Sequence, residues 1–385
     1  MMLRIIQKLP LFYLVLLAIV GVIMRLMPFV DLPFNFENIR HAHSHLAFLG
    51  WVYTAFYVLI WRFFLSDSKH EKRLSFLFWI TQLAIIGMFV CFWNFGYQPI
   101  SIGFMVVHTF LAYWFIAYVL RHIEVASITR FLLLAAFGFF IFSSIGPFSI
   151  PILKVMEQEE YMTAAVNFYL HFHYNGWFIF GIFALLSHFM DFKAYKTHFW
   201  ILIGTTIFAY FELLYLYQLP PFLLLLTNIF IILQWIIVSI LIFEILKQFK
   251  TTFINSTKTV VTIAFSILWI KYSTQVLGVL PSSWLEFEFF THFNIIAYLH
   301  LLFLGFVTPM ILTFYTNEKW LNFSIIGWII YGCGWLLTEV GLFLMGTINA
   351  SFIKLITIGS VMILLGILWL LFKRKSFSVE LKTRA

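Results

Sequence analysis

The chain has 385 residues, of which 63% are hydrophobic, 21% aromatic and only 10% charged. A water-soluble protein of this length needs far more polar surface, so the composition excludes a soluble globular protein and predicts an integral membrane protein. The formal net charge of +8 does not indicate a nucleic-acid partner, because the basic residues are confined to short segments between apolar runs. Cys91 and Cys333 lie within apolar runs, which predicts neither a disulfide framework nor covalent attachment of a c-type haem.

Apolar stretches long enough to cross a bilayer follow one another along almost the whole chain. A membrane-spanning helix needs roughly 20 apolar residues, and turns and charges divide the chain into about twelve such stretches. We expect spans near residues 9–30, 41–62, 74–96, 101–121, 130–148, 163–189, 198–217, 221–246, 259–280, 291–315, 320–346 and 352–372. The predicted fold is therefore all-α, with one transmembrane domain over residues 1–372 and a short charged tail at 373–385. The first apolar run lacks a small-residue cleavage site, so we expect a span there rather than a signal peptide.

Lysine and arginine fall on alternate predicted loops. One side of the membrane receives most of them, including Arg62, Arg130 and the basic residues 373–375. The other side receives turns that contain proline and the acidic segment 157–160. By the positive-inside rule, both termini are predicted to be cytoplasmic, in a bacterial-type inner membrane. The lipid bilayer is the partner that composition predicts.

Three segments repeat one pattern, in which a histidine is followed five residues later by glycine and then by an aromatic residue. They read HLAFLGW from His45, HFHYNGW from His171 and HLLFLGF from His300, so the histidines are 126 and 129 residues apart. A polar side chain is costly in an apolar helix and is therefore a functional candidate. The recurrence predicts a pseudo-threefold bundle whose histidines point to a shared interior. The glycines are expected to admit either a flat macrocycle or a neighbouring helix.

Further histidines lie on the same predicted helices or at a similar depth in the outer half of the membrane. Four helices therefore offer imidazoles there: His41, His43 and His45; His108; His171 and His173; and His300. Neutral imidazole ligates haem iron and copper, and two helices can hold one haem between them. His171 and His173 are about 200° apart around an ideal helix and are expected to face two adjacent pockets. A hydrogen-bonded, purely structural role stays open for each histidine.

Spans and histidines together resemble subunit I of the haem-copper oxidase superfamily, which includes respiratory oxidases and nitric oxide reductases. The number of spans, the cytoplasmic termini and the outer-half histidines of spans two, six and ten carry this resemblance. It implies that His45 ligates a low-spin haem, that His171 ligates copper or a non-haem metal, and that His300 ligates haem. Two family features are missing, because span seven, WILIGTTIFAYFELLYLYQ, has no histidine pair and position 302 is Leu302. A complete oxygen-reducing centre is therefore not implied. The segments HAHSHLAFLGW and HLLFLGFVTPMI are also similar to the NnrS family, whose members contain haem and copper and are linked to nitric oxide stress.

These patterns predict a protein that binds haem b, with copper as a further cofactor. His45 and His300 are the expected axial ligands of one haem. His171, together with His173 and His108, is expected to form a second haem or copper site, and two more candidate metal ligands are His41 and His43. The expected function is electron transfer, or nitric oxide or oxygen handling as an oxidoreductase. An electron-donor cytochrome or another membrane subunit is the expected protein partner.

Five other charged residues are predicted within or near the apolar core. Arg25 and Arg40 could bind haem propionates through bidentate hydrogen bonds or extend to the lipid headgroups. Glu212, Lys271 and Glu339 are expected to form a proton path, propionate contacts or interhelical ion pairs. Two other classes of protein also stay open, a secondary transporter with a histidine-lined pathway and a non-catalytic assembly subunit.

Overall fold

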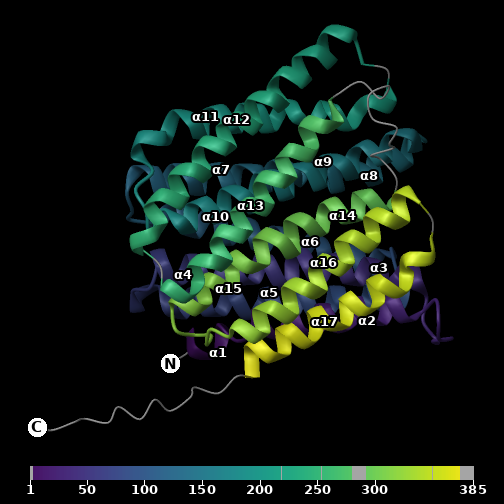
Figure 1. Cartoon of the computed structure of the whole chain (residues 1–385), viewed down its shortest axis with the longest axis horizontal. Helices are drawn as coiled ribbons and strands as arrows, with labels where there is room; N and C mark the ends of the chain where they lie inside the picture. The colour runs from purple at the N-terminus through teal and green to yellow at the C-terminus, as the bar shows by residue number, and fades with distance from the viewer. Residues whose placement is uncertain (1–2, 218, 253, 280–291, 349, 373–385) are drawn as a thin grey trace, which may run out of the picture.

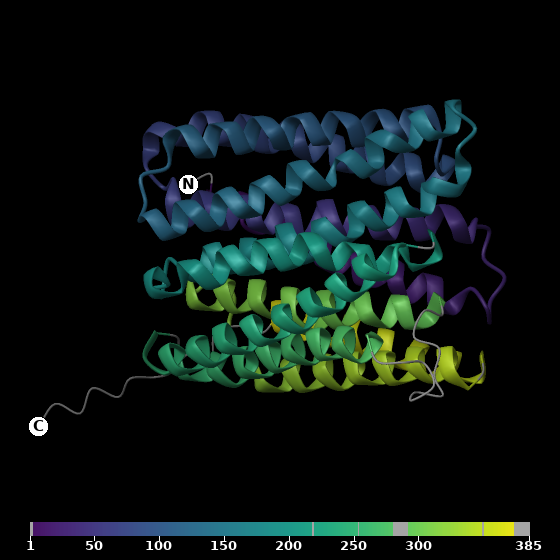
Figure 2. The ribbon, with the colours of Figure 1, turned by 90° about the horizontal axis from the view of Figure 1, so that it is seen from above.

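The computed structural model describes residues 3–217, 219–252, 254–279, 292–348 and 350–372. Within these residues the secondary structure is entirely helical, and the helices run roughly along one common axis (Figure 1). Figure 2 shows them stacked in layers, with the blue helices of residues 68–155 on one side and the green to yellow C-terminal helices on the other. The predicted charged tail, 373–385, lies outside the described residues.

The helices of the first half are interrupted twice by π-helical segments, η1 and η3. In chain order they are α1 (Leu3–Ile6), α2 (Leu9–Leu26), α3 (Phe36–His45), η1 (Leu46–Tyr53), α4 (Thr54–Phe64), α5 (Ser68–Phe95), α6 (Pro99–His122), α7 (Ser127–Ser143), α8 (Ile145–Val155), η2 (Glu159–Tyr161), α9 (Met162–His171), η3 (Phe172–Phe178) and α10 (Ile179–Leu186). Several begin with a defined cap; for example, the side chain of Asn35 accepts a hydrogen bond from the backbone of Asn38 at the start of α3.

The second half contains one further π-helical segment, η7. Its elements are η4 (Lys193–Tyr195), α11 (Lys196–Ala209), η5 (Tyr210–Tyr217), α12 (Pro221–Thr252), α13 (Asn255–Gly278), α14 (His292–Leu302), η7 (Phe303–Val307), α15 (Thr308–Asn317), α16 (Ile325–Thr347), η8 (Ala350–Phe352) and α17 (Ile353–Phe372). The segments η4, η5 and η8 are 3₁₀-helical.

Eleven helical stretches among the described residues are long and apolar enough to cross a membrane. The predicted span 163–189 forms a continuous helical stretch, residues 162–186, but is not one of the eleven. His171, His173 and Asn175 make this stretch less apolar than the others. The multi-pass, all-α architecture is confirmed, and the count of twelve spans stays a prediction.

Large apolar side chains cover the outside of the bundle. Leu83 of α5 is 69% exposed and Phe243 of α12 is 67% exposed. A soluble monomer rarely leaves so many such side chains in water, whereas lipid chains solvate them. The apolar helices therefore indicate contact with a lipid bilayer.

Each of the three repeated sequence motifs forms a helix of the same kind. An α-helical segment that contains the motif histidine is followed by a π-helical segment and then by another α-helix: α3–η1–α4, α9–η3–α10 and α14–η7–α15. Figure 1 shows α3, α9 and α14 toward one end of the bundle and α4, α10 and α15 toward the other, so the three helices run in the same direction. Because π-helical turns are rare and are frequent at functional sites, their recurrence gives the sequence repeat a structural counterpart.

Aromatic contacts join these three motif helices to one another at the centre of the bundle. The ring centroids of Phe48 and Phe303 are 4.8 Å apart, and those of Phe178 and Phe303 are 5.4 Å apart. Trp51 Nε1 donates a hydrogen bond of 2.9 Å to Thr308 Oγ1. The motif aromatics are therefore core residues, and their helices form the centre around which the other helices pack.

The motif glycines provide room for neighbouring side chains. A Cβ at Gly176 would lie 2.3 Å from Phe139 Cγ, and one at Gly305 would lie 2.6 Å from Ile267. A Cβ at Gly50 would lie 2.6 Å from Leu46 of the same helix. Of the two expected roles of these glycines, close packing is the one that the structure shows.

Gly176→Ala is expected to lower the stability of the protein. The new methyl group would overlap the Phe139 ring, and overpacking of a core costs about 1–3 kcal/mol. Gly138→Ala in α7 is the matched control, because a Cβ there meets nothing within 4 Å and alanine favours a helix over glycine by up to about 1 kcal/mol. Thermal unfolding in detergent measures both variants. Equal melting temperatures for the two would contradict the packing role of Gly176.

Candidate functional site

The candidate site residues that are buried in the described part of the bundle fall into three clusters, each formed between the motif helices and a different set of surrounding helices. Cluster one contains His45, Tyr53, His108, Ser143 and His173. Cluster two contains His171, Asn175, Glu212, Lys271 and Gln275. Cluster three contains Arg25, His43, His300 and Glu339.

Cluster three joins helices α2, α3, α14 and α16. His300 Nδ1 lies 4.0 Å from Glu339 Oε1. Arg25 and His43 are close enough to His300 to interact with it electrostatically. The His43 ring packs against α2 at Gly21, where a Cβ would lie 3.3 Å from His43 Cε1. Two imidazoles, one carboxyl and one guanidinium from four helices therefore meet in this cluster.

Three buried polar atoms of cluster three have no hydrogen-bond partner among the described residues. They are Nδ1 of His43, Nδ1 of His300 and Oε1 of Glu339. Leaving such an atom unsatisfied costs about 1–3 kcal/mol, so these atoms are candidates for contact with a ligand or with water.

His300 and Glu339 of cluster three are only partly buried. Of their side chains, 26% of His300 and 13% of Glu339 are exposed. The cluster therefore combines candidate ligands with partial access to their side chains.

His43, rather than His45, lies within electrostatic range of His300. The two histidines are two residues apart in α3 and so point to different sides of that helix. The His45 ring instead packs on Phe92, with centroids 4.2 Å apart, and His45 Nε2 lies 3.4 Å from the Tyr97 hydroxyl. The structure thus differs from the expected pairing of His45 with His300, because the rotation of α3 directs His45 toward α5.

Cluster one brings together histidines from three helices. His108 is within electrostatic range of both His45 and His173. Ser143 Oγ donates its single proton to the Phe140 carbonyl at 2.7 Å, so His173 Nδ1–H must donate the 3.1 Å hydrogen bond between His173 and Ser143. His173 Nε2 then carries a free lone pair. It has no partner among the described residues, and neither does Nε2 of His108.

The donor atoms of cluster one suit a metal, but aromatic side chains fill the space around them. The rings of Tyr169, Phe178, Phe140 and Phe48 have centroids 4.8, 4.9, 5.3 and 5.6 Å from that of His173. All three histidines of the cluster are buried. Within the described residues, no group of three or more His, Cys, Asp or Glu side chains is already arranged to hold a metal ion. The copper site stays a prediction.

Cluster two engages both ring nitrogens of His171. Because the Thr206 carbonyl only accepts, His171 Nε2–H donates the 2.8 Å hydrogen bond between them. His171 Nδ1 then accepts from the Asn175 amide at 3.2 Å, and Asn175 Oδ1 accepts from Lys271 Nζ. No ring nitrogen of His171 is left for a metal in this arrangement, in contrast to His173 two residues later. The expected orientation of these two histidines toward different sides is confirmed.

Two other predicted site residues lie at the rim. Arg40 forms an ion pair with Glu37 at the exposed start of α3. His41 Nε2 lies 3.9 Å from the same carboxylate, and its ring packs on Tyr97 with centroids 4.5 Å apart. Of the two arginines expected at propionates, Arg25 alone belongs to cluster three.

The uncharged side chains that form hydrogen bonds with the predicted site residues were not predicted from the sequence. Asn175 lies four residues after His171, and Gln275 lies four residues after Lys271. Residues at this spacing are neighbours on a helix surface, so the spacing could have identified both. Ser143 gives no such signal, because it reaches His173 from a different helix.

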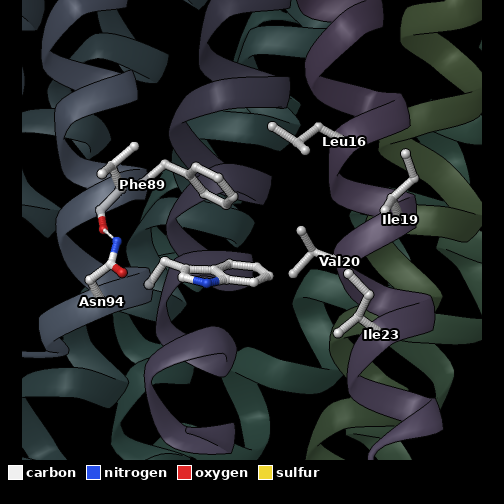
Figure 3. Close-up of a pocket in the computed structure, with 8 residues that line it drawn as sticks. Leu16, Ile19, Val20, Ile23, Phe89 and Asn94 are labelled. Carbon is white, nitrogen blue, oxygen red and sulfur yellow. Dashed lines mark hydrogen bonds between the residues drawn. The ribbon is translucent and has the colours of Figure 1, made fainter. Parts of the chain in front are cut away.

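An apolar groove of about 270 Å³ lies between α2 and α5 (Figure 3). Its lining contains no titratable group: Leu16, Ile19, Val20, Ile23, Phe89, Val90, Trp93 and Asn94. It offers surface for a lipid chain but no donor atoms for a metal. The clusters, rather than this groove, are therefore the candidate sites.

The fold and the clusters define a polytopic all-α membrane protein with buried histidine and charged clusters. No known protein family matches the chain, and no curated protein matches it.

Proposed function

We propose that this chain is a haem-binding integral membrane protein that transfers electrons, with one b-type haem held between His43 and His300 in cluster three. The observation that carries the proposal is the pair of imidazoles from separate helices, within electrostatic range of each other and next to the Glu339 carboxyl. Bound there, haem supplies a one-electron redox couple whose potential depends on its axial ligands and surroundings.

The residues of cluster three fit such a group. A ligating histidine usually donates its other ring N–H to a carboxylate or carbonyl, and Glu339 lies on the Nδ1 side of His300. Arg25 is the nearby cation that would bind a propionate. A porphyrin provides four ligands itself, so two imidazoles suffice and no group of three protein ligands is required.

If His43 and His300 both held the haem iron, they would leave no position for nitric oxide or oxygen, which favours electron transfer as the function. The repeated α–π–α helices and the three clusters around them support the resemblance to haem-copper oxidase subunit I. In that reading, His45, His108 and His173 would be the residues that hold a second haem or copper. The bundle would lie in an inner membrane with cytoplasmic termini, and an electron-donor cytochrome would be its partner.

The optical spectrum of the detergent-purified protein tests the proposal. We expect a Soret band, and a pyridine haemochrome spectrum of haem b after extraction. Protein that lacks both Soret absorbance and iron after expression with ample haem would contradict the proposal.

A secondary transporter is the alternative, and cluster two favours it. Its buried Lys271 and Glu212 are the kind of intramembrane charges that mark transport pathways. Uptake of a solute or of protons into liposomes by haem-free protein would support this alternative over the first.

A further inference from the structure

Lys271 is held in a site built for a cation. Its side chain is fully buried, at 0% exposure. Its Nζ donates to Asn175 Oδ1 and, at 2.9 Å, to Gln275 Oε1. It also lies 3.8 Å from the centroid of the Tyr272 ring. Two acceptors and a ring face suit the three protons of an ammonium. A neutral amine would instead turn its lone pair toward the electron-rich face of Tyr272, so these contacts favour the charged form of Lys271.

Glu212 balances this charge through an intervening side chain. Gln275 Oε1 accepts from Lys271, so the amide N–H of Gln275 donates to the Glu212 carboxylate. Glu212 lies on η5, the 3₁₀-helical segment that follows the end of α11 at Ala209. 3₁₀-helical turns are frequent at the ends of α-helices. Glu212 is only partly buried.

The other titratable groups that face this pair are His171, Tyr174, Tyr272 and Tyr298. His171 already uses both ring nitrogens, so a further proton would displace the Asn175 hydrogen bond. The tyrosines are neutral at neutral pH. A protonated Glu212, in contrast, still accepts from Gln275 through its carbonyl oxygen. Glu212 is therefore the group that gains a proton without loss of the network.

We propose that Glu212 is a proton-binding site within the membrane, with Lys271 as its fixed counter-charge and Gln275 as the bridge between them. Uptake of one proton converts the carboxylate to a carboxyl, and its release reverses the step. The site uses residues of cluster two alone, so it does not depend on a haem in cluster three.

Infrared titration of the purified protein tests this site directly. A carbonyl band of a protonated carboxyl should grow as the pH falls and should disappear in Glu212→Gln. Glu318→Gln is the matched control, because Glu318 lies in a peripheral ion pair with Arg62, and this variant should keep the band. A wild-type protein without the band, or a band that survives in Glu212→Gln, would overturn the proposal.

Lys271→Met tests the counter-charge. Removal of a nearby positive charge favours the neutral carboxyl, so the proton affinity of Glu212 should rise at least about tenfold, which moves the titration midpoint up by about one pH unit or more. Lys271→Arg keeps the charge and should shift the midpoint much less. Should Lys271→Met fail to fold, Gln275→Leu, which breaks the bridge, should also raise the midpoint. An unchanged midpoint in the folded variants would refute the coupling.

Discussion

Purified His43→Ala and His300→Ala proteins are expected to lose their Soret absorbance, whereas His45→Ala is expected to keep it. Each of the first two changes removes a proposed axial ligand, and even loss of a residue that only orients a ligand lowers metal affinity about 10–100-fold. We therefore expect haem content per protein to fall at least about tenfold. His45 contacts Phe92 and Tyr97 instead of His300, so its removal leaves the ligand pair intact.

His198→Ala is the control for these variants, since His198 lies near the start of α11, outside all three clusters. It should bind as much haem as the wild type. If haem were lost in His45→Ala and retained in His43→Ala, the haem site would be in cluster one instead of cluster three.

Asn175→Ala is expected to give the largest loss of stability among single changes in cluster two. It removes an acceptor from Lys271 and a donor from His171 at once. Each buried polar group left unsatisfied costs about 1–3 kcal/mol, and more for a charged group, so the sum is a large part of the stability of a typical domain. Unfolding in detergent, followed by circular dichroism, measures the change.

Asn94→Ala is the matched control for Asn175→Ala. The Asn94 side chain lies at the exposed end of α5 and donates to the Val90 carbonyl of its own helix at 2.8 Å. Surface changes of this kind usually alter stability by less than about 0.5 kcal/mol. If Asn175→Ala were as stable as Asn94→Ala, the hydrogen-bond network would not stabilise the bundle as described.

Composition and apolar run length were sufficient to predict the class of the protein, because a bilayer demands long apolar helices. The repeated motif predicted related helices at the centre, and the structure shows three of them in contact. The sixth predicted span shows the limit of this reasoning. A central helix touches little lipid and can therefore carry His171, His173 and Asn175, which makes it the least apolar of the predicted spans.

The sequence alone could not predict which histidines lie close to one another. Helical periodicity states that His43 and His45 point apart, but not which of them meets His300. That choice depends on the rotation of α3 about its own axis, which packing against α2 and α5 determines. The π-helical segments could not be predicted either, because a wider helical turn depends on packing and no particular residue type indicates it strongly.

The most direct test of the central claim is an electron cryo-microscopy map of the haem-replete protein. We predict macrocycle density flanked by His43 and His300, with Arg25 at a propionate. A map in which these side chains are well defined and the space between them holds no macrocycle would contradict the account.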